Sequence, residues 1–186
     1  SDEAELVRMI NTSVDINDKP SAFRYPRGNG VGLNLPTIDE KLDIGKGRII
    51  KEGKKIALLN FGARLNECLI VRENLLKKGI NLTLVDARFV KPLDENLIWQ
   101  LATDHEAIIT IEEGSIGGFG SHVGQYLADK NLLDNNLKYR SMVLPDRFID
   151  HDKPDLMYKY AGLDANSIEV KVLDTLNSKV IIKKTN

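Results

Sequence analysis

Short apolar runs alternate with helical stretches along most of this chain, and that rhythm leaves few folds open to it. Continuous apolar runs are typical of parallel strands that are buried on both faces, and helices between them predict βαβ units. We therefore predict an α/β fold, with a mostly parallel sheet and helices on both of its faces. The predicted strands are Lys55–Asn60, Asn81–Asp86, Ala107–Ile111 and Leu137–Leu144, and the predicted helices are Arg64–Lys78, Asp94–Asp104, Ser121–Asn131, Lys153–Ala161 and Ala165–Ser178.

Residues 1–47 lack this rhythm. Asp2 is a favourable helix N-cap, Glu5 lies three residues beyond it, and apolar residues then follow at helical spacing. A short strand is predicted over Ser21–Tyr25. From residue 26 to residue 47, glycine and proline recur too often for a long regular element. We predict a domain boundary near residue 45, which separates residues 1–45 from residues 46–186.

Charge and composition exclude several classes of protein. The net charge of -1 argues against binding to nucleic acid or to an anionic membrane, since both use clustered lysine and arginine. No apolar run approaches the roughly 18 residues of a membrane span. The single cysteine, Cys68, rules out an internal disulfide, which fits a reducing compartment, and its apolar neighbours predict that it is buried in the core.

The segment RYPRGNGVG contains the first candidate binding site. Two arginines, Arg24 and Arg27, are followed by three glycines within a short loop. Arginine presents a planar fork of donors that suits phosphate oxygens, and glycine lets backbone N–H groups approach an anion closely. This pattern predicts an anion site for a phosphorylated metabolite. A surface loop with structural arginines is the alternative.

A second glycine-rich loop runs from a predicted strand into a predicted helix and contains Gly117, Gly118 and Gly120. Loops in this setting often bind phosphate at the helix N-terminus. However, the glycine spacing fits neither common nucleotide-binding pattern, and the adjacent Glu112 and Glu113 would repel a phosphate. These two glutamates could serve as acid and base, but no partner is evident. We favour a loop that contacts another domain.

Two further segments have charged residues. In ARFVKPLD, Arg88 and Lys91 could bind a ligand at the end of a strand, although a structural ion pair between Asp86 and Arg88 is favoured.

In LPDRFIDH, the residues Asp146, Asp150 and His151 could bind a metal. No further histidine or cysteine lies at ligand spacing, so we predict no metal site in this chain.

Five segments in the same order make the chain resemble the 1-deoxy-D-xylulose-5-phosphate synthase family, which consists of transketolase-like thiamine-diphosphate enzymes. The resemblance covers essentially the whole chain, and it implies a homodimeric, three-domain enzyme. By this likeness, residues 1–45 are the C-terminal tail of a pyrimidine-binding α/β domain plus a linker, and residues 46–186 are a transketolase C-terminal domain. The segments are RYPRGNGVG, ALLNFGARL, ARFVKPLDE, ITIEEGSIGGFGSHV and LPDRFIDH.

The resemblance also implies an activity. Enzymes of this family join pyruvate to glyceraldehyde 3-phosphate with release of CO₂, in the synthesis of isoprenoid precursors and thiamine, in the cytoplasm or a plastid-type organelle. Thiamine diphosphate and Mg²⁺ are bound mainly by segments absent from this chain, so no catalytic residue carries over, and the chain alone is expected to be inactive. The second arginine of YPRG binds the aldehyde's phosphate in the family, and that residue here is Arg27.

The same likeness suggests that the loop with Gly117, Gly118 and Gly120 lies near an interdomain face. Its partners would be the N-terminal domains of the same polypeptide and a second copy of the chain. Two alternatives stay open at this point. One is a stand-alone, non-catalytic assembly module, and the other is the beta subunit of a 2-oxoacid dehydrogenase.

Overall fold

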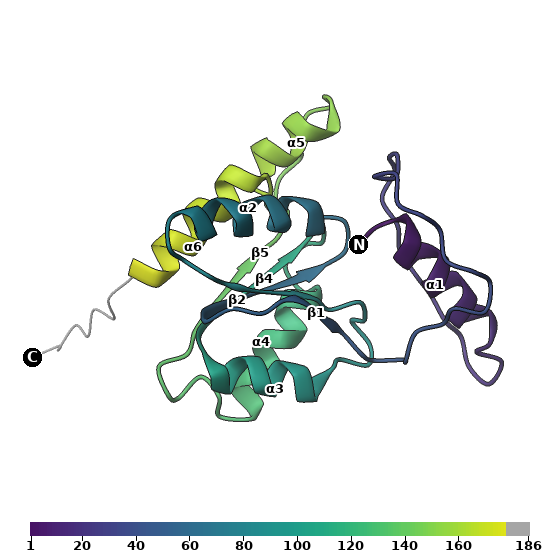
Figure 1. Ribbon diagram of the computed structural model, residues 1–186, viewed down its shortest axis with the longest axis horizontal. Helices are drawn as coiled ribbons and strands as arrows, with labels where there is room; N and C mark the ends of the chain where they lie inside the picture. Colours follow the sequence, from purple (N-terminus) through teal and green to yellow (C-terminus); the bar gives the residue numbers. More distant parts are fainter. Residues whose placement is uncertain (178–186) are drawn as a thin grey trace, which may run out of the picture.

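A five-stranded sheet forms the centre of the computed structural model, which describes residues 1–177 (Figure 1). The strand order is β1-β3-β2-β4-β5. Strand β2 pairs in parallel with β3 and β4, β4 pairs in parallel with β5, and β1 runs antiparallel to β3 at one edge. The predicted, mostly parallel sheet is therefore confirmed. The strands are β1 Arg48–Lys51, β2 Lys55–Phe61, β3 Thr83–Asp86, β4 His105–Glu112 and β5 Lys138–Met142.

Helices cover both faces of this sheet. Helices α2 (Leu65–Lys77) and α6 (Ala165–Asn177) lie on one face, and α3 (Glu95–Asp104) and α4 (Phe119–Asp129) lie on the other (Figure 1). Helix α5 (Pro154–Ala161) precedes α6 at the top of this view. The five predicted helices are confirmed to within two residues at each described end; Ser178 lies outside the described residues. None of the helices within residues 1–177 is long and apolar enough to cross a membrane.

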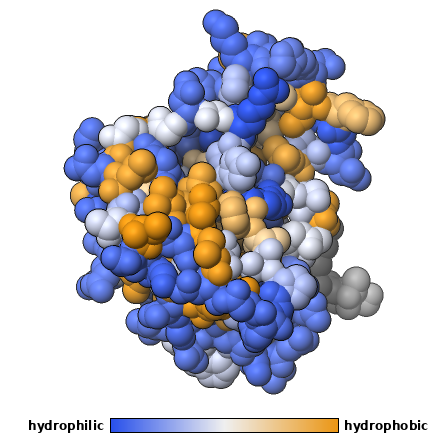
Figure 2. All heavy atoms as spheres, turned by 90° about the vertical axis from the view of Figure 1, so that its right-hand side faces the viewer, coloured by the Kyte–Doolittle hydropathy of each residue, from blue (hydrophilic) through white to orange (hydrophobic). Residues whose placement is uncertain are grey.

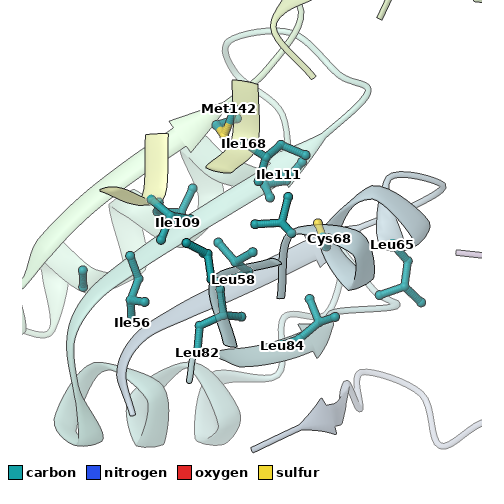
Figure 3. Close-up of a cluster of buried hydrophobic side chains, with 14 of the residues drawn as sticks. Ile56, Leu58, Leu65, Cys68, Leu82, Leu84, Ile109, Ile111, Met142 and Ile168 are labelled. Atoms are coloured by element: carbon teal, nitrogen blue, oxygen red, sulfur yellow. The ribbon is translucent and has the colours of Figure 1, made fainter. Parts of the chain in front are cut away.

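Two apolar clusters hold the layers together, one on each face of the sheet. Along β2 the side chains alternate between them: Ile56 and Leu58 face α2 and α6, whereas Ala57 and Leu59 face α3 and α4. This period of two, with both faces covered, produces the continuous apolar run seen in the sequence. Figure 3 shows the first cluster, in which Cys68 packs among leucine and isoleucine side chains.

Cys68 belongs to the core, as predicted. It is fully buried, and burial raises the pKa of its thiol because a thiolate would lose its hydration there. The native protein should therefore not react with a thiol reagent such as iodoacetamide.

The N-terminal part departs from the predictions at one point. Helix α1 (Glu3–Val14) forms as expected, and the Asp2 carboxylate caps it by accepting the Glu5 N–H at 2.8 Å. The predicted strand Ser21–Tyr25 is wrong, since these residues form no regular element. A strand needs a hydrogen-bonded neighbour, and no described segment pairs with it. Strand β1, by contrast, was not predicted, because four residues with charged ends give a weak signal.

Candidate functional site

The carboxyl ends of β2 and β4 are where an open α/β sheet would be expected to bind a ligand. The connections that leave these two strands lead to α2 and α4 on opposite faces, which defines a topological switch point. In this chain, protein side chains contact one another at the switch point. The Arg64 guanidinium donates to the Glu113 carboxylate at 2.7 Å and lies 3.6 Å from the ring centroid of Tyr158. Glu113 therefore acts as an ion-pair partner in this chain.

The glycine-rich loop after β4 is occupied in a similar way. Glu112 is only 2% exposed, and its carboxylate accepts the N–H groups of Phe119 at 3.1 Å and Gly120 at 2.8 Å. These are orphan donors in the first turn of α4, and a helix N-terminus favours a negative charge. A protein carboxylate thus takes the place that a phosphate occupies in nucleotide-binding loops.

Two of the three glycines in this loop are needed inside the domain. A Cβ on Gly118 would lie 2.5 Å from Glu112 Oε2, and a Cβ on Gly120 would lie 2.7 Å from Thr110 Oγ1. Gly117 instead has a φ of 97°, at the exposed turn next to Ile116, whose side chain is 77% exposed. The contact of this loop with another domain stays a prediction, and Ile116 is the side chain best placed to make it.

A buried carboxylate attaches α1 to the sheet. Glu5 is 2% exposed and contacts three arginines: Arg8 at 2.9 Å, Arg48 at 3.0 Å and Arg88 at 2.7 Å. Burial raises the pKa of Glu5, but the hydrogen bond from Arg88 and the charges of Arg48 and Arg88 outweigh it and leave the pKa lowered. Arg88 reaches Glu5 from a left-handed backbone conformation, with a φ of 59°.

The ion pair predicted between Asp86 and Arg88 is wrong, although both side chains are structural. Asp86 accepts from Arg48 at 3.2 Å and from the Ser1 hydroxyl at 2.8 Å, while Arg88 turns to Glu5. Asp86 and Arg88 lie two positions apart in the sequence, but they do not pair with each other. The partner of Asp86 is Arg48 of β1, and the partner of Arg88 is Glu5 of α1. The carboxyl edge of β3 is therefore an attachment point for the N-terminal helix.

We expect Glu5→Gln to loosen α1 without unfolding the sheet. The amide would leave the partly buried Arg88 without its counter-charge. Arg8 would keep Glu40, and Arg48 would keep Asp86. The loss at Arg88 should lower the free energy of local opening by about 2–3 kcal/mol. Hydrogen exchange read by mass spectrometry should then be faster over residues 3–14 and unchanged in β2 and β4.

Glu73→Gln is a matched control for this experiment. Glu73 is also a helical glutamate paired with an arginine, Arg72, but its side chain is 56% exposed, so its loss should have an effect of about 0–1 kcal/mol. Equal exchange rates in the Glu5→Gln and Glu73→Gln variants would show that the arginines do not hold α1.

Because the pKa of Glu5 is lowered on folding, the contribution of Glu5 to stability is present at neutral pH and is lost as the pH falls through that lowered pKa.

Arg27 lies in an exposed loop that approaches the N-terminal end of α1. Residues 21–30 are all exposed, and neither Arg24 nor Arg27 has a hydrogen-bond or ion-pair partner within residues 1–177. The backbone that follows does bind an anion, but that anion belongs to the protein: the Glu3 carboxylate accepts hydrogen bonds from the N–H groups of Val31, Gly32 and Leu33. The backbone half of the predicted anion site is thus filled internally, and Arg27 is left to face solvent.

The remaining candidate residues stay separate. Asp146, Asp150 and His151 are exposed, and no group of three or more His, Cys, Asp or Glu side chains in residues 1–177 is arranged to hold a metal ion. Lys91 is exposed and takes no part in the ion pairs that hold α1 in the described structure. Sequence reasoning missed the roles of Glu3 and Glu5. The only local signal was the spacing of Glu5 from Asp2, which suggested a capping box.

Apolar side chains gather on the face that residues 1–45 present. Figure 2 views the molecule from the side of α1, and hydrophobic residues are clustered in the middle of that face. Among residues 1–177, nine of the eighteen exposed large hydrophobic side chains fall within residues 1–45. Such a patch is typical of a surface that another protein part covers. The nine exposed side chains are those of Ile10, Val14, Phe23, Tyr25, Val31, Leu33, Leu35, Ile38 and Ile44.

Comparison with known proteins places most of the chain in one family. Residues 45–168 match the family described as "Transketolase, C-terminal domain". Among solved structures, a split-gene transketolase, described as an inactive beta4 tetramer, superposes with a TM-score of 0.67 at 26% sequence identity. That match covers 77% of this chain and 46% of the other.

Two further transketolase structures share the fold at lower identity. The enzyme from Campylobacter jejuni superposes with a TM-score of 0.53 at 15% identity, over 70% of this chain and 18% of its own. A mutant transketolase from Pichia stipitis gives the same TM-score and identity, over 71% of this chain and 18% of its own. This chain therefore spans less than half the length of these relatives.

Proposed function

The chain belongs to the family of transketolase C-terminal domains, and from that premise we propose that it is the C-terminal part of a 1-deoxy-D-xylulose-5-phosphate synthase. In this role the whole enzyme condenses pyruvate with glyceraldehyde 3-phosphate and releases CO₂. Residues 1–177 contribute a site for the substrate phosphate at Arg27 and contacts to the other domains of a homodimer. The observation that carries the proposal is Arg27, an exposed arginine without a partner in residues 1–177, within the segment RYPRGNGVG.

The proposed role of Arg27 is to bind the negative charge of the substrate phosphate. A guanidinium offers several N–H donors in a plane and keeps its charge at every physiological pH, so it can bind a phosphate dianion through two parallel hydrogen bonds. No neighbouring carboxylate competes for it within the described residues. Binding the phosphate would fix the position of the aldehyde in the active site.

Thiamine diphosphate supplies the carbanion chemistry in such an enzyme when it is bound. The residues described here do not fit its diphosphate and metal. The glycine-rich N-terminus of α4 is filled by the buried Glu112 carboxylate, and residues 1–177 offer no cluster of metal ligands. We therefore assign cofactor binding to other domains, and we place the apolar patch of residues 1–45 against them.

The test of Arg27 is a substitution in enzyme that contains the remaining domains, thiamine diphosphate and Mg²⁺. Arg27→Ala should raise the KM for glyceraldehyde 3-phosphate by roughly 10- to 100-fold, because a charged hydrogen bond to the phosphate is lost. The KM for pyruvate should not change. Arg140→Ala removes an exposed arginine from β5 and serves as a control. An unchanged KM for the phosphorylated aldehyde would refute the assignment.

A second candidate is a subunit of a split transketolase-type enzyme, which the likeness to the split-gene transketolase favours. The donor substrate separates the two. CO₂ release from pyruvate supports the synthase, whereas transfer from a ketose phosphate without CO₂ release supports the transketolase. In either case this chain alone should show no turnover, and clear turnover by the purified chain would place a cofactor site within it.

A further inference from the structure

We propose that Glu3 is the positioning residue for Arg27, because its carboxylate holds the loop from which Arg27 reaches the substrate phosphate. The inference rests on the proposed role of Arg27. Glu3 is the first residue of α1, and Arg27 lies in an exposed loop 24 positions further along the chain. The Glu3 side chain reaches this loop by accepting hydrogen bonds from backbone N–H groups four to six residues beyond Arg27, which the sequence alone does not reveal.

Three successive amides converge on this one carboxylate. The N–H groups of Val31, Gly32 and Leu33 donate to the Glu3 oxygens at 3.0, 2.5 and 2.8 Å. Such a run of N–H groups around an anion forms a nest, which requires a left-handed residue, and Gly32 provides it with a φ of 88°. A Cβ on Gly30 would lie 2.7 Å from the Glu3 carboxylate, so the glycines of this loop are fitted around Glu3.

The loop has little else to hold it. Within the described part of the chain, these three bonds are the only hydrogen bonds that join residues 18–36 to any other segment. All ten residues from 21 to 30 are exposed, so apolar burial does not fix them either. The position of the loop relative to the domain therefore depends on Glu3.

Glu3 is itself held in place by α1. The helix is capped by Asp2 and anchored to the sheet by the arginines around Glu5. A continuous series of contacts thus runs from the carboxyl edge of β3, through α1, to the Arg27 loop. The pKa of Glu3 is lowered to about 2 by hydrogen bonds from the Glu3 N–H and from the N–H groups of Val31 and Leu33. The Glu3 carboxylate therefore stays ionised near neutral pH.

This arrangement also separates two roles within RYPRGNGVG. The glycine nest cannot take the substrate phosphate while Glu3 fills it, because two anions would compete for the same N–H groups. The nest fixes the loop, and Arg27 is the group left to bind the phosphate.

The experiment compares Glu3→Gln with the parent protein in two measurements. A glutamine amide has only one acceptor oxygen and no charge, so it cannot satisfy three amides. In this chain, backbone order parameters from ¹⁵N relaxation should fall below about 0.6 over residues 26–33 and stay high in β2 and β4. In the holoenzyme, the KM for glyceraldehyde 3-phosphate should rise roughly tenfold, since a misplaced binding group lowers the affinity.

Two comparisons make the result specific. The kcat/KM for D-glyceraldehyde, which lacks the phosphate, should be unchanged, and so should every property of Glu52→Gln, which alters an exposed glutamate outside the loop. Unchanged order parameters in Glu3→Gln would overturn the proposal. So would a loosened loop with a normal KM for the phosphorylated aldehyde, if Arg27→Ala raises that KM. If Arg27→Ala leaves that KM unchanged as well, the proposed function fails and takes this inference with it.

Discussion

Replacing Glu112 by alanine is expected to lower the free energy of unfolding by about 2–5 kcal/mol, because two buried N–H groups lose their acceptor. The Glu112 carboxylate accepts hydrogen bonds from the N–H groups of Phe119 and Gly120, and all three residues are buried. The loss also removes a negative charge from the N-terminus of α4, where the helix dipole favours one.

Urea unfolding measures this loss, with the fluorescence of the single tryptophan, Trp99 in α3, as the probe. Glu106→Ala is the matched control, since Glu106 lies on the same strand, β4, but is exposed. Its substitution should change the stability by less than about 0.5 kcal/mol. Glu112→Gln keeps one acceptor oxygen and should fall between the two. If Glu112→Ala were as stable as Glu106→Ala, the capping of α4 by Glu112 would not contribute to folding.

The sheet could be predicted because its signal is local. Ile56, Ala57, Leu58 and Leu59 form an unbroken apolar run, and only a strand covered on both faces needs one. Ser21–Tyr25 was predicted as a strand without such an apolar run, and it forms no strand, since pairing depends on a neighbour that the described residues do not supply. The same segment lies in the exposed apolar region of residues 1–45, which we place against another domain.

In the candidate site, too, local sequence patterns suggest some residues but do not reveal partners that are distant in the sequence. Arg27 is proposed from its own segment, because an arginine beside glycines can bind an anion, and its role stays a prediction. The partners of Glu3 and Glu5 could not be, since Glu3 binds amides 28–30 residues away and Glu5 binds Arg88, 83 residues away. Helix position alone predicted a capping role for Glu5. The three-dimensional fold gave that carboxylate three arginines instead.

Glu112 shows how far a chemical argument from sequence can reach. Adjacent carboxylates before the glycine loop argued against a bound phosphate, and the structure gives the reason: Glu112 itself occupies the helix N-terminus. What the sequence did not reveal is that Glu113 has a separate partner, Arg64, on the loop that leaves β2. Such partners depend on strand order, which periodicity does not determine.

Phe119→Ala should be at least as destabilising as the loss of Glu112, with a decrease of about 3–5 kcal/mol in the free energy of unfolding. Phe119 is 1% exposed and stacks on Phe61 with ring centroids 4.8 Å apart, which ties the start of α4 to the end of β2. The space left by the ring would join a void of about 10 Å³ lined also by Leu59 and Ile98. Because these neighbours belong to the sheet and to α3, they cannot move in to fill it.

Phe148 supplies the control, since it undergoes the same change in chemistry without the burial. Its side chain is fully exposed, so Phe148→Ala should leave the urea midpoint within the error of the parent protein. The difference between the two variants then isolates the packing of α4 on the sheet from any general effect of losing a phenyl ring. A small loss in both variants would mean that the contact between Phe61 and Phe119 does not help to hold α4 on β2, and that Glu112 alone fixes the start of this helix.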